Sequence, residues 1–279
     1  MFRNNCLIEI EDKMRTGIEK LHDMMETLTK ENVMVAFSGG VDSSLLLQLA
    51  CSKAQENGTA VYAVTVSTKL HPHGDVEIAR RVADEAGAIH RVIEIDELQE
   101  TGIENNPKNR CYLCKKGIFT KIMELARTLG ISTIIEGTNE DDLHVYRPGI
   151  QALKELGIIS PLAACGITKA EVRELALARG ISVANRPSMP CLATRLPYGD
   201  SISYELLAQI DKGEQYVRSF GFYNVRLRVH DTITRIEVDQ KDIPKLLEHR
   251  EEIIAELKKL GFVYITVDLE GFRSGSMDL

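Results

Sequence analysis

Short apolar runs alternate with amphipathic segments through the first half of the chain. Four runs rich in Val, Ile and Ala predict buried strands, at residues 33–37, 60–66, 89–95 and 131–135. Apolar residues at helical spacing mark helices around these strands, at residues 8–28, around Leu45 and Leu49, and at residues 76–86 and 118–129. This alternation predicts an α/β fold with a parallel sheet that helices cover on both faces.

The pattern changes beyond residue 203. It predicts a helix, a β-hairpin, a second helix and a last strand, at residues 204–220, 224–238, 243–260 and 262–269. The hairpin turns at Asp231-Thr232, and antiparallel pairing is expected in this smaller α/β module. Residues 184–201 are rich in Pro, Gly, Ser and Asn and have little periodicity. The expected domains are 1–183, a loop or linker at 184–202, and 203–279.

Composition limits the class of protein. The chain has 279 residues, of which 44% are hydrophobic and 27% charged, as in ordinary globular proteins. No apolar run approaches the roughly 20 residues of a membrane span, and the first residues lack the apolar core of a signal peptide. A cytoplasmic location is therefore expected. The net charge of −7 argues mildly against a large nucleic-acid-binding surface.

The first predicted strand leads into Ser38-Gly39-Gly40-Val41-Asp42-Ser43, where a helix begins. A strand, a glycine turn and a helix start present backbone N–H groups and the positive end of a helix dipole, which suit phosphate. The Gly-Lys-Ser/Thr of a Walker loop and the spaced glycines of a dinucleotide fingerprint are absent. Asp42 is suited to hold Mg²⁺ against phosphates, and Ser43 to cap the helix and donate to phosphate. The alternative is a strand–helix turn without a ligand, in which Asp42 is an ordinary N-cap.

Loops that follow strands of a parallel sheet meet at one edge. The loops after Phe37, Val66 and Ile135 are therefore expected to converge. The last of them carries clustered carboxylates in residues 136–142 and then Arg147. Such a cluster can bind nucleotide, metal or an anionic substrate, or can be a solvated loop. Further on, Thr168 and Glu171 predict a helix-capping box.

Three of the six cysteines carry the strongest chemical signal. Cys111 and Cys114 form a Cys-x-x-Cys motif at a helix start, beside basic residues that favour thiolates. Cys191 lies far along the chain. The pattern is compatible with an iron–sulfur cluster, a zinc site or a redox-active dithiol. A zinc site would take its fourth ligand from His71, His73 or His144. The other cysteines, read as small apolar or incidental residues, are Cys6, Cys51 and Cys165.

Arg226 and Arg228 are two residues apart on the first hairpin strand, which puts both on one face. Glu237 follows on the partner strand. Two guanidinium groups on one face suit a phosphate monoester. The alternative is a surface ladder of salt bridges.

The segment from Ser38 to Ser43 resembles the pyrophosphate loop (PP-loop) of ATP pyrophosphatases. Further motifs narrow this resemblance to the LarE family of sulfurtransferases: Arg110-Cys111-Tyr112-Leu113-Cys114-Lys115, Glu136-Gly137-Thr138-Asn139, Arg147-Pro148-Gly149, Pro190-Cys191-Leu192-Ala193-Thr194-Arg195, Pro197-Tyr198-Gly199 and Gly271-Phe272-Arg273-Ser274-Gly275-Ser276-Met277. Thr194 stands where the family more often has serine, which keeps the hydroxyl. The motifs run from residue 33 to the end of the chain.

The resemblance implies a PP-loop domain of the adenine nucleotide alpha hydrolase type, joined to a smaller α/β domain that binds substrate and oligomerises. It implies that ATP is cleaved between its α and β phosphates, and that a carboxylate of pyridinium-3,5-biscarboxylic acid mononucleotide is adenylylated and then converted to a thiocarboxylate. The product serves the nickel-pincer nucleotide cofactor. A homo-oligomer and a sulfide or other sulfur donor are also implied.

The resemblance assigns roles to residues of this chain. One branch of the family sacrifices the sulfur of the cysteine that matches Cys191, whereas the other binds a [4Fe–4S] sulfur carrier through three cysteines, which match Cys111, Cys114 and Cys191. This chain has all three, so the cluster branch is expected. Catalytic roles fall to Cys191, Asp42, Ser43 and Arg195. Cofactor or substrate contacts are expected from Ala36, Ser38, Gly39, Gly40, Val41, Asp42, Ser43, Ser44, Val64, Gly137, Thr138, Arg226 and Arg228. Metal contacts are expected from the three cysteines and, for Mg²⁺, from Asp42, Glu214 and Glu237.

Two other functions compete with this interpretation. A tRNA-thiolating PP-loop enzyme also uses three cysteines and a cluster, but it would normally carry a basic RNA-binding surface or a zinc-binding module, which the sequence lacks. A non-catalytic regulator that binds zinc or nucleotide is the second alternative, and zinc without iron in the purified protein would favour it.

Overall fold

The computed structural model describes residues 16–72, 74–273 and 275–277, so residues 8–15 of the first predicted helix, together with Cys6 and His73, lie outside the described part. The described residues 16–28 are helical. The chain divides into two compact units. Unit 1 contains the described residues up to Ser67, then Gly74–Ile95 and Cys111–Arg186. Unit 2 contains residues 68–72, Asp96–Arg110 and the described residues from Pro187 onward.

Unit 1 is built on a four-stranded parallel sheet of order β3-β2-β1-β4, which confirms the predicted α/β class. Its strands are β1 Val33–Ala36, β2 Val61–Ser67, β3 Ile89–Glu94 and β4 Thr133–Ile135. Each lies within one or two residues of its predicted run. The central strands β1 and β2 are near-continuous hydrophobic segments because both of their faces are covered, whereas the edge strand β3 is partly polar and mostly exposed. The helices of unit 1 are α2 Val41–Asn57, α3 Asp75–Ala86, α5 Arg110–Thr128, α6 Gly149–Glu155, α7 Pro161–Ala164 and α8 Lys169–Ala178, with a 3₁₀ helix η1 at Glu140–His144.

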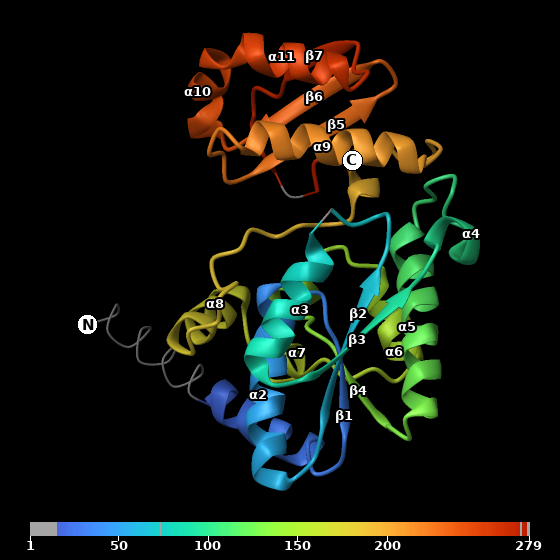
Figure 1. Cartoon of the computed structure of the whole chain (residues 1–279), viewed down its shortest axis with the longest axis vertical. Coiled ribbons are helices and arrows are strands. Elements are labelled where there is room, and N and C mark those ends of the chain that lie inside the picture. The colour runs from blue at the N-terminus through green and yellow to red at the C-terminus, as the bar shows by residue number, and fades with distance from the viewer. Residues whose placement is uncertain (1–15, 73, 274, 278–279) are drawn as a thin grey trace. The chain divides into compact units, whose positions relative to one another are not determined.

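Two apolar clusters cover the two faces of this sheet. One joins residues of α2, α3 and α8 to β1 and β2, and the other joins α5 to Met34, Val64 and Ile134. Figure 1 shows α2 and α3 on one side of the strands and α5 and α6 on the other. Helix α2 begins where β1 ends, so it carries the glycine turn to the carboxyl edge of the sheet. That edge is where open parallel sheets bind ligands.

Unit 2 contains a three-stranded sheet of order β5-β6-β7. Strands β5 (Val225–His230) and β6 (Ile233–Val238) form the predicted antiparallel hairpin, and Asp231 occupies the turn with a φ of 53°. Strand β7 (Tyr264–Val267) pairs with β6 in parallel rather than in the expected antiparallel sense. The connection from β6 to β7 contains two helices, and a parallel neighbour needs such a long crossover.

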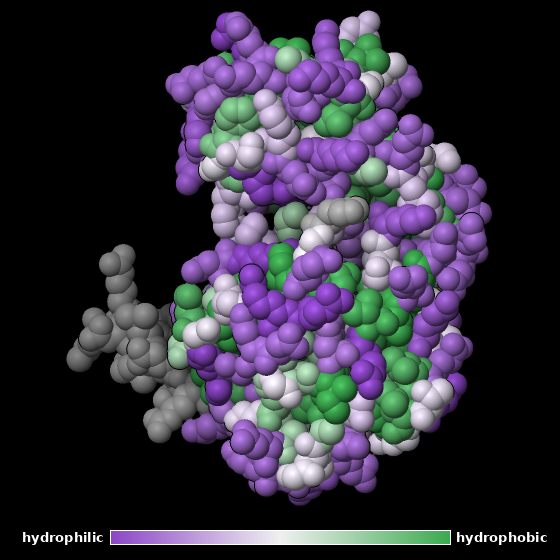
Figure 2. Space-filling view, viewed as in Figure 1, coloured by the Kyte–Doolittle hydropathy of each residue, from purple (hydrophilic) through white to green (hydrophobic). Residues whose placement is uncertain are grey.

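The remaining elements of unit 2 are α4 Glu97–Thr101, η2 Leu192–Arg195, α9 Tyr204–Arg218, η3 Gln240–Asp242, α10 Ile243–Glu248 and α11 Arg250–Lys259. The single helix predicted for residues 243–260 is therefore interrupted at His249, whose ring lies 4.5 Å from that of Phe220 between centroids. Much of the visible face of this unit carries hydrophilic side chains (Figure 2). The expected domain boundaries stay a prediction. They assign residues 68–72 and Asp96–Arg110 to the first domain, whereas these segments group with unit 2.

No helix within the described ranges is long and apolar enough to cross a membrane.

The core of unit 2 has no room at Gly213, which lies on the inner face of α9. A Cβ there would stand 2.5 Å from Leu227 Cδ1 and 2.9 Å from Leu257 Cδ2. We expect Gly213→Ala to lower the free energy of unfolding by about 1–3 kcal/mol, the usual cost of overpacking a core. Urea unfolding measures this, with Lys212→Ala at the exposed neighbouring position as the control. Equal stability of the two variants would contradict the packing of α9 on β5.

Candidate functional site

The turn between β1 and α2 is closed by two serine hydroxyls. The amide of Gly40 donates to Ser38 Oγ at 3.3 Å, and that of Ser38 to Ser43 Oγ at 3.4 Å. Ser43 Oγ donates to the Gly40 carbonyl at 3.1 Å. Gly39 has a φ of 69°, and a Cβ there would lie 3.1 Å from the backbone of Ala79 in α3. Glycine is therefore required at this position by both conformation and space.

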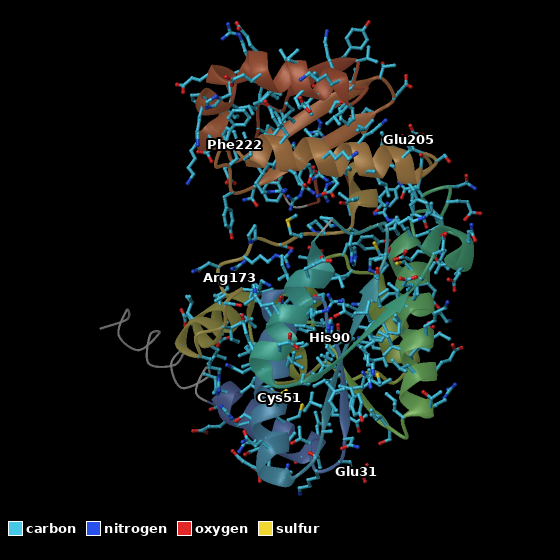
Figure 3. All side chains as sticks on the ribbon, viewed as in Figure 1. Glu31, Cys51, His90, Arg173, Glu205 and Phe222 are labelled. Carbon is cyan, nitrogen blue, oxygen red and sulfur yellow. The ribbon has the colours of Figure 1, made fainter. Side chains whose placement is uncertain are left out.

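The strand that enters the turn is fixed from the neighbouring strand. The Phe37 amide donates to the Val64 carbonyl at 2.8 Å, and Ala36 pairs with Val64 in register. Thr65 Oγ1 donates to the Phe37 carbonyl at 2.8 Å and lies 2.8 Å from Nε2 of His90, which Figure 3 labels. Burial lowers the pKa of His90, with help from the charge of Arg80. The two predicted residues Ala36 and Val64 thus lie beneath the turn.

The loop after β4 meets the start of α2, as the convergence of strand ends predicts. A Cβ on Gly137 would lie 2.9 Å from the Ser43 amide nitrogen, so only glycine allows this approach. The buried Glu136 carboxylate accepts from the Thr138 amide at 3.0 Å and from the Thr138 hydroxyl at 2.9 Å. Lys115 Nζ of α5 lies 3.5 Å from the same carboxylate. Glu136 therefore stabilises the conformation of the loop that carries Gly137 and Thr138.

Asp42 is held by Asn139, which belongs to the predicted motif after β4, and by Lys169, which the sequence did not single out. Asn139 Nδ2 donates to Asp42 Oδ1 at 3.0 Å, and Lys169 Nζ forms an ion pair with Asp42 Oδ2. Lys169 is the first residue of α8, which begins with the predicted capping box of Thr168 and Glu171. That box was the available signal, because it placed a lysine in the first turn of a helix in the same domain. Its proximity to Asp42, 127 residues away in sequence, could not be read from the motif.

Arg186 is a second cation at this edge. Its Nη1 donates to the Gly39 carbonyl at 3.3 Å, and its Nη2 pairs with Asp75 Oδ1 at 2.6 Å. Ser44 Oγ donates to the Gly40 carbonyl at 2.8 Å. The carbonyls of Gly39 and Gly40 in the turn therefore both accept hydrogen bonds, and the cations Lys169 and Arg186 lie near the turn. Such an arrangement is suited to binding a polyanion.

The Cys-x-x-Cys motif lies in the first turns of α5, which begins at Arg110. Cys111 is exposed and Cys114 is half-buried. Tyr112, between them, donates to Glu155 of α6 at 2.7 Å, and Lys116 Nζ contacts the Tyr112 oxygen at 2.9 Å and Glu155 at 3.0 Å. These contacts tie the cysteine-bearing end of α5 to α6.

Two other cysteines have the character of apolar residues. Burial raises the pKa of Cys51 to about 11, and it also raises the pKa of Cys165. Cys51 lies on α2 (Figure 3). A thiol with a raised pKa is a poor nucleophile and a poor metal ligand near neutral pH.

In unit 2, the loop that carries Cys191 is held by Arg195. This guanidinium is fully buried and forms a bidentate pair with Glu214 of α9, with N–O distances of 2.7 and 2.9 Å. Its Nη1 donates to the carbonyls of Pro190 and Cys191 at 3.1 and 3.3 Å. Thr194 Oγ1 closes the same turn by donating to the Cys191 carbonyl at 2.7 Å. Arg195 therefore positions the backbone of Cys191.

The hairpin arginines also hold this loop. Arg226 Nη2 donates to the Ser188 carbonyl at 2.9 Å, and Arg228 Nη1 to the Thr194 carbonyl at 2.9 Å. Arg228 in addition donates twice to Glu237 Oε2, at 3.0 and 2.9 Å. Both arginines are buried, and neither forms an exposed salt-bridge ladder. Burial lowers the pKa of Arg226 to about 10.

A fourth guanidinium, that of Arg110, reaches the same loop. It pairs with Asn106 Oδ1, donates to the Ala193 carbonyl at 3.1 Å, and lies 5.3 Å from the centre of the Tyr198 ring. Arg110 belongs to unit 2 and immediately precedes Cys111. Unit 2 therefore contains both Cys191 and the residue before the first cysteine of the motif.

The two glutamates predicted near a metal already have cationic partners. Glu214 pairs with Arg195, and Glu237 accepts from Arg228, from Arg235 at 3.1 Å and from Ser276 at 2.7 Å. Among the described residues, no group of three or more His, Cys, Asp or Glu side chains is arranged to hold a metal ion. Their role as metal ligands stays a prediction.

The histidines proposed as zinc ligands separate between the units. His71 belongs to unit 2, and His144 belongs to unit 1, where its Nε2 lies 2.9 Å from Glu140 Oε1.

The Arg195–Glu214 pair gives a stability prediction. Burial acts to raise the pKa of Glu214, but Arg195, with Arg226 and the Leu227 amide, outweighs it and holds the pKa below its usual value. Arg195→Met leaves a buried carboxylate without its bidentate partner. We expect the free energy of unfolding to fall by about 3–5 kcal/mol in a denaturant titration at neutral pH. Lys259→Met, which removes an exposed pair with Glu256, is the control and should change stability little.

The lowered pKa of Glu214 also sets the sign of the pH dependence. A carboxyl group with a depressed folded-state pKa contributes its full stability above its unfolded value of about 4.3. That contribution is lost as the pH falls through the lower folded value. The loss on acidification should be smaller in Arg195→Met. An equal loss in both proteins would contradict the stabilising role of the pair.

Several known proteins are similar to this chain. A family model described as a PP-loop domain matches residues 13–144. A pyridinium-3,5-bisthiocarboxylic acid mononucleotide synthase of Lactiplantibacillus plantarum is 35% identical over 249 residues, 89% of this chain and 89% of its own. An uncharacterised protein of Synechocystis sp. is 37% identical over 267 residues, 95% of this chain and 98% of its own. A tRNA-specific 2-thiouridylase MnmA of Sphingopyxis alaskensis is 28% identical over 212 residues, 61% of this chain and 53% of its own.

Proposed function

The chain belongs to the LarE family of PP-loop proteins, and from that premise we propose that it is an ATP-dependent sulfurtransferase. The proposed reaction adenylylates a carboxylate of a pyridinium mononucleotide and converts it to a thiocarboxylate for the nickel-pincer nucleotide cofactor. The observation that carries the proposal is the association of two features in one chain. One is a phosphate-type turn at the carboxyl edge of a parallel sheet, and the other is a cysteine loop held by four arginines.

The activating half of the reaction is proposed for unit 1. Backbone amides at Gly40 and the first turn of α2 would bind ATP phosphates, with Ser38 and Ser43 as hydroxyl partners. The substrate carboxylate attacks the α-phosphate, pyrophosphate leaves, and an acyl-adenylate forms. Lys169 and Arg186 can stabilise negative charge at the same edge. Mg²⁺, when bound, would neutralise phosphate charge, and Asp42 is the carboxylate suited to hold it because Mg²⁺ uses one or two carboxylates together with phosphates.

The sulfur-transferring half is proposed for Cys191. A sulfur nucleophile attacks the acyl carbon of the adenylate, AMP leaves, and the thiocarboxylate remains. Three thiolates suit an iron–sulfur cluster by donor chemistry, so Cys111, Cys114 and Cys191 are the residues that would hold one. Such a cluster, when bound, would supply a reusable sulfur. The buried Arg195 orients the Cys191 backbone through its carbonyl contacts.

Arg226 and Arg228 are proposed to bind the substrate phosphate. Support comes from their burial beside the Cys191 loop and from the alignment of the hairpin with that of the family. A phosphate would compete with the carbonyls of Ser188 and Thr194 for these guanidinium groups. Binding the mononucleotide would therefore be linked to the conformation of the loop.

Similarity to the MnmA thiouridylase keeps tRNA thiolation as the second candidate. It is weaker on two grounds. The similarity covers 53% of that relative, and the net charge of this chain is −7.

The function is tested by incubating the full-length protein with ATP, Mg²⁺ and either the pyridinium biscarboxylic acid mononucleotide or unmodified tRNA. We expect AMP, pyrophosphate and a thiocarboxylate product with the mononucleotide, detected by mass spectrometry. Asp42→Asn should reduce pyrophosphate release by about 100-fold or more, the scale of losing an electrostatic partner of the reacting phosphates. Asp84→Asn, at an exposed position of α3, is the matched control and should retain activity.

AMP formation with tRNA and not with the mononucleotide would overturn the proposed substrate. Full pyrophosphate release by Asp42→Asn would remove the role given to that carboxylate.

The three-cysteine proposal is tested by the iron content of protein purified without oxygen. We expect iron and sulfide in the wild type and their loss in Cys111→Ser, Cys114→Ser and Cys191→Ser, because each change removes one thiolate ligand. Cys51→Ser is the control, since its buried thiol has a raised pKa and lies on α2.

Zinc without iron in the wild type, or iron that survives all three substitutions, would contradict the cluster. Mass loss of hydrogen sulfide from Cys191 after turnover would point instead to the sacrificial branch of the family.

A further inference from the structure

A buried carboxylate lies in unit 2 at the start of α4. Glu97 is 1% exposed, although α4 has only five residues and its other glutamate, Glu100, is exposed. One oxygen, Oε2, accepts a hydrogen bond from Thr68 Oγ1. The other, Oε1, accepts none from the described residues. Burial raises the pKa of Glu97, and the Thr68 hydroxyl opposes that rise. Burying a carboxylate costs free energy unless hydrogen bonds or a charge partner compensate for it, and here only one of the two oxygens accepts a hydrogen bond from the described residues.

Hydrogen bonds connect this carboxylate to the cysteine loop. The Leu70 amide donates to Thr68 Oγ1 at 3.0 Å, and the Leu192 amide donates to the Leu70 carbonyl at 2.7 Å. Leu192 directly follows Cys191, which is the N-cap of η2. The series therefore runs from Leu192 through Leu70 and Thr68 to Glu97, and all of its members belong to unit 2.

The directions of these bonds are mutually consistent. A hydroxyl has one proton to donate and lone pairs to accept with. The Thr68 proton is directed to the carboxylate, so its oxygen is free to accept from the Leu70 amide. Without the carboxylate, the hydroxyl could rotate, and the Leu70 amide would lose the acceptor that restrains the backbone at this residue. The carbonyl of Leu70, in the next peptide unit, would then be held less firmly toward the amide of Leu192 beside Cys191.

We propose that Thr68 and Glu97 are positioning residues for Cys191. They precede the Cys191 loop in the sequence, whereas Arg195, Arg226 and Arg228 follow Cys191. Arg195, Arg226 and Arg228 bind carbonyls of the loop, whereas the Thr68–Glu97 pair acts on an amide. The proposal deepens the sulfur-transferring half of the proposed function and rests on it for the consequence in catalysis. The effect on Cys191 itself does not depend on which substrate the enzyme uses.

Contacts with α9 hold α4, and with it Glu97 of the Thr68–Glu97 pair, in place. Asp96, the N-cap of α4, accepts from the Gln99 amide at 3.2 Å and from the Tyr204 hydroxyl at 2.5 Å. The ammonium of Lys69 lies 4.7 Å from the centre of the Tyr204 ring. Lys69, which follows Thr68, and Asp96 at the start of α4 therefore both contact Tyr204, the first residue of α9.

The test compares Thr68→Val, which keeps the shape but removes the hydroxyl, with Thr68→Ser, which restores it. The first readout is the rate at which iodoacetamide alkylates Cys191 in the full-length protein, followed by peptide mass spectrometry with the exposed Cys111 as internal reference. We expect Thr68→Val to change the Cys191 rate, relative to Cys111, by about tenfold, the factor that one hydrogen bond to a charged group controls. Thr68→Ser and the exposed Glu100→Gln should match the wild type. Glu97→Gln, which keeps an acceptor oxygen but removes the charge, should give a smaller change.

The second readout separates the two half-reactions. Thr68→Val should lower thiocarboxylate formation by about tenfold and leave pyrophosphate release unchanged, because the activating residues are in unit 1. Equal loss of both activities, or an alkylation rate that is the same in Thr68→Val and wild type, would overturn the proposal. An altered alkylation rate in a protein that makes no thiocarboxylate would uphold the positioning role and count against the proposed function.

Discussion

The buried pair of Arg195 and Glu214 is the interaction on which the cysteine loop depends. A buried ion pair is tolerated only when every donor and acceptor in it has a partner. Here the guanidinium of Arg195 binds Glu214 and also donates to the carbonyls of Pro190 and Cys191. The ion pair thereby links the rigid α9 helix to a segment with little regular structure. Packing alone fixes little of the segment before η2, because Ser188 and Pro190 are exposed and Cys191 is half-buried.

In unit 1, the main constraint is the close approach of backbone segments around the turn between β1 and α2. Gly39 allows the turn to approach α3, and Gly137 allows the loop after β4 to approach α2, more closely than any side chain would permit. The resulting turn is held by the serine hydroxyls and by the guanidinium of Arg186, while Asp42 is paired with Lys169 and Asn139. The ion pair with Lys169 fixes the Asp42 carboxylate at this edge of the sheet.

The parts of this architecture that depend on local sequence were predictable. Segments rich in Val and Ile predicted all four strands of the parallel sheet, including the partly polar edge strand β3, and the capping box at Thr168 is present as predicted. Contacts between distant segments were not. Lys169 meets Asp42 across 127 residues, and the partners of Arg226 and Arg228 are loop carbonyls that have no sequence signature. The parallel pairing of β6 with β7 and the break at His249 likewise follow from tertiary packing, which hydrophobic periodicity does not encode.

The spacing of the hairpin arginines Arg226 and Arg228 does not by itself reveal which groups they bind in the folded protein. Their sequence spacing suggests a phosphate site, but in the folded protein their donors already bind Ser188, Thr194 and Glu237. When an anion replaces a carbonyl as the acceptor of a buried guanidinium, the net gain in free energy is only the difference between the two hydrogen-bonding interactions. A dianionic phosphate is a stronger acceptor than a neutral carbonyl, so the exchange favours phosphate while it removes two restraints from the cysteine loop. Arg195 and the Leu70 carbonyl would then carry that loop, since neither has to release it for phosphate to bind.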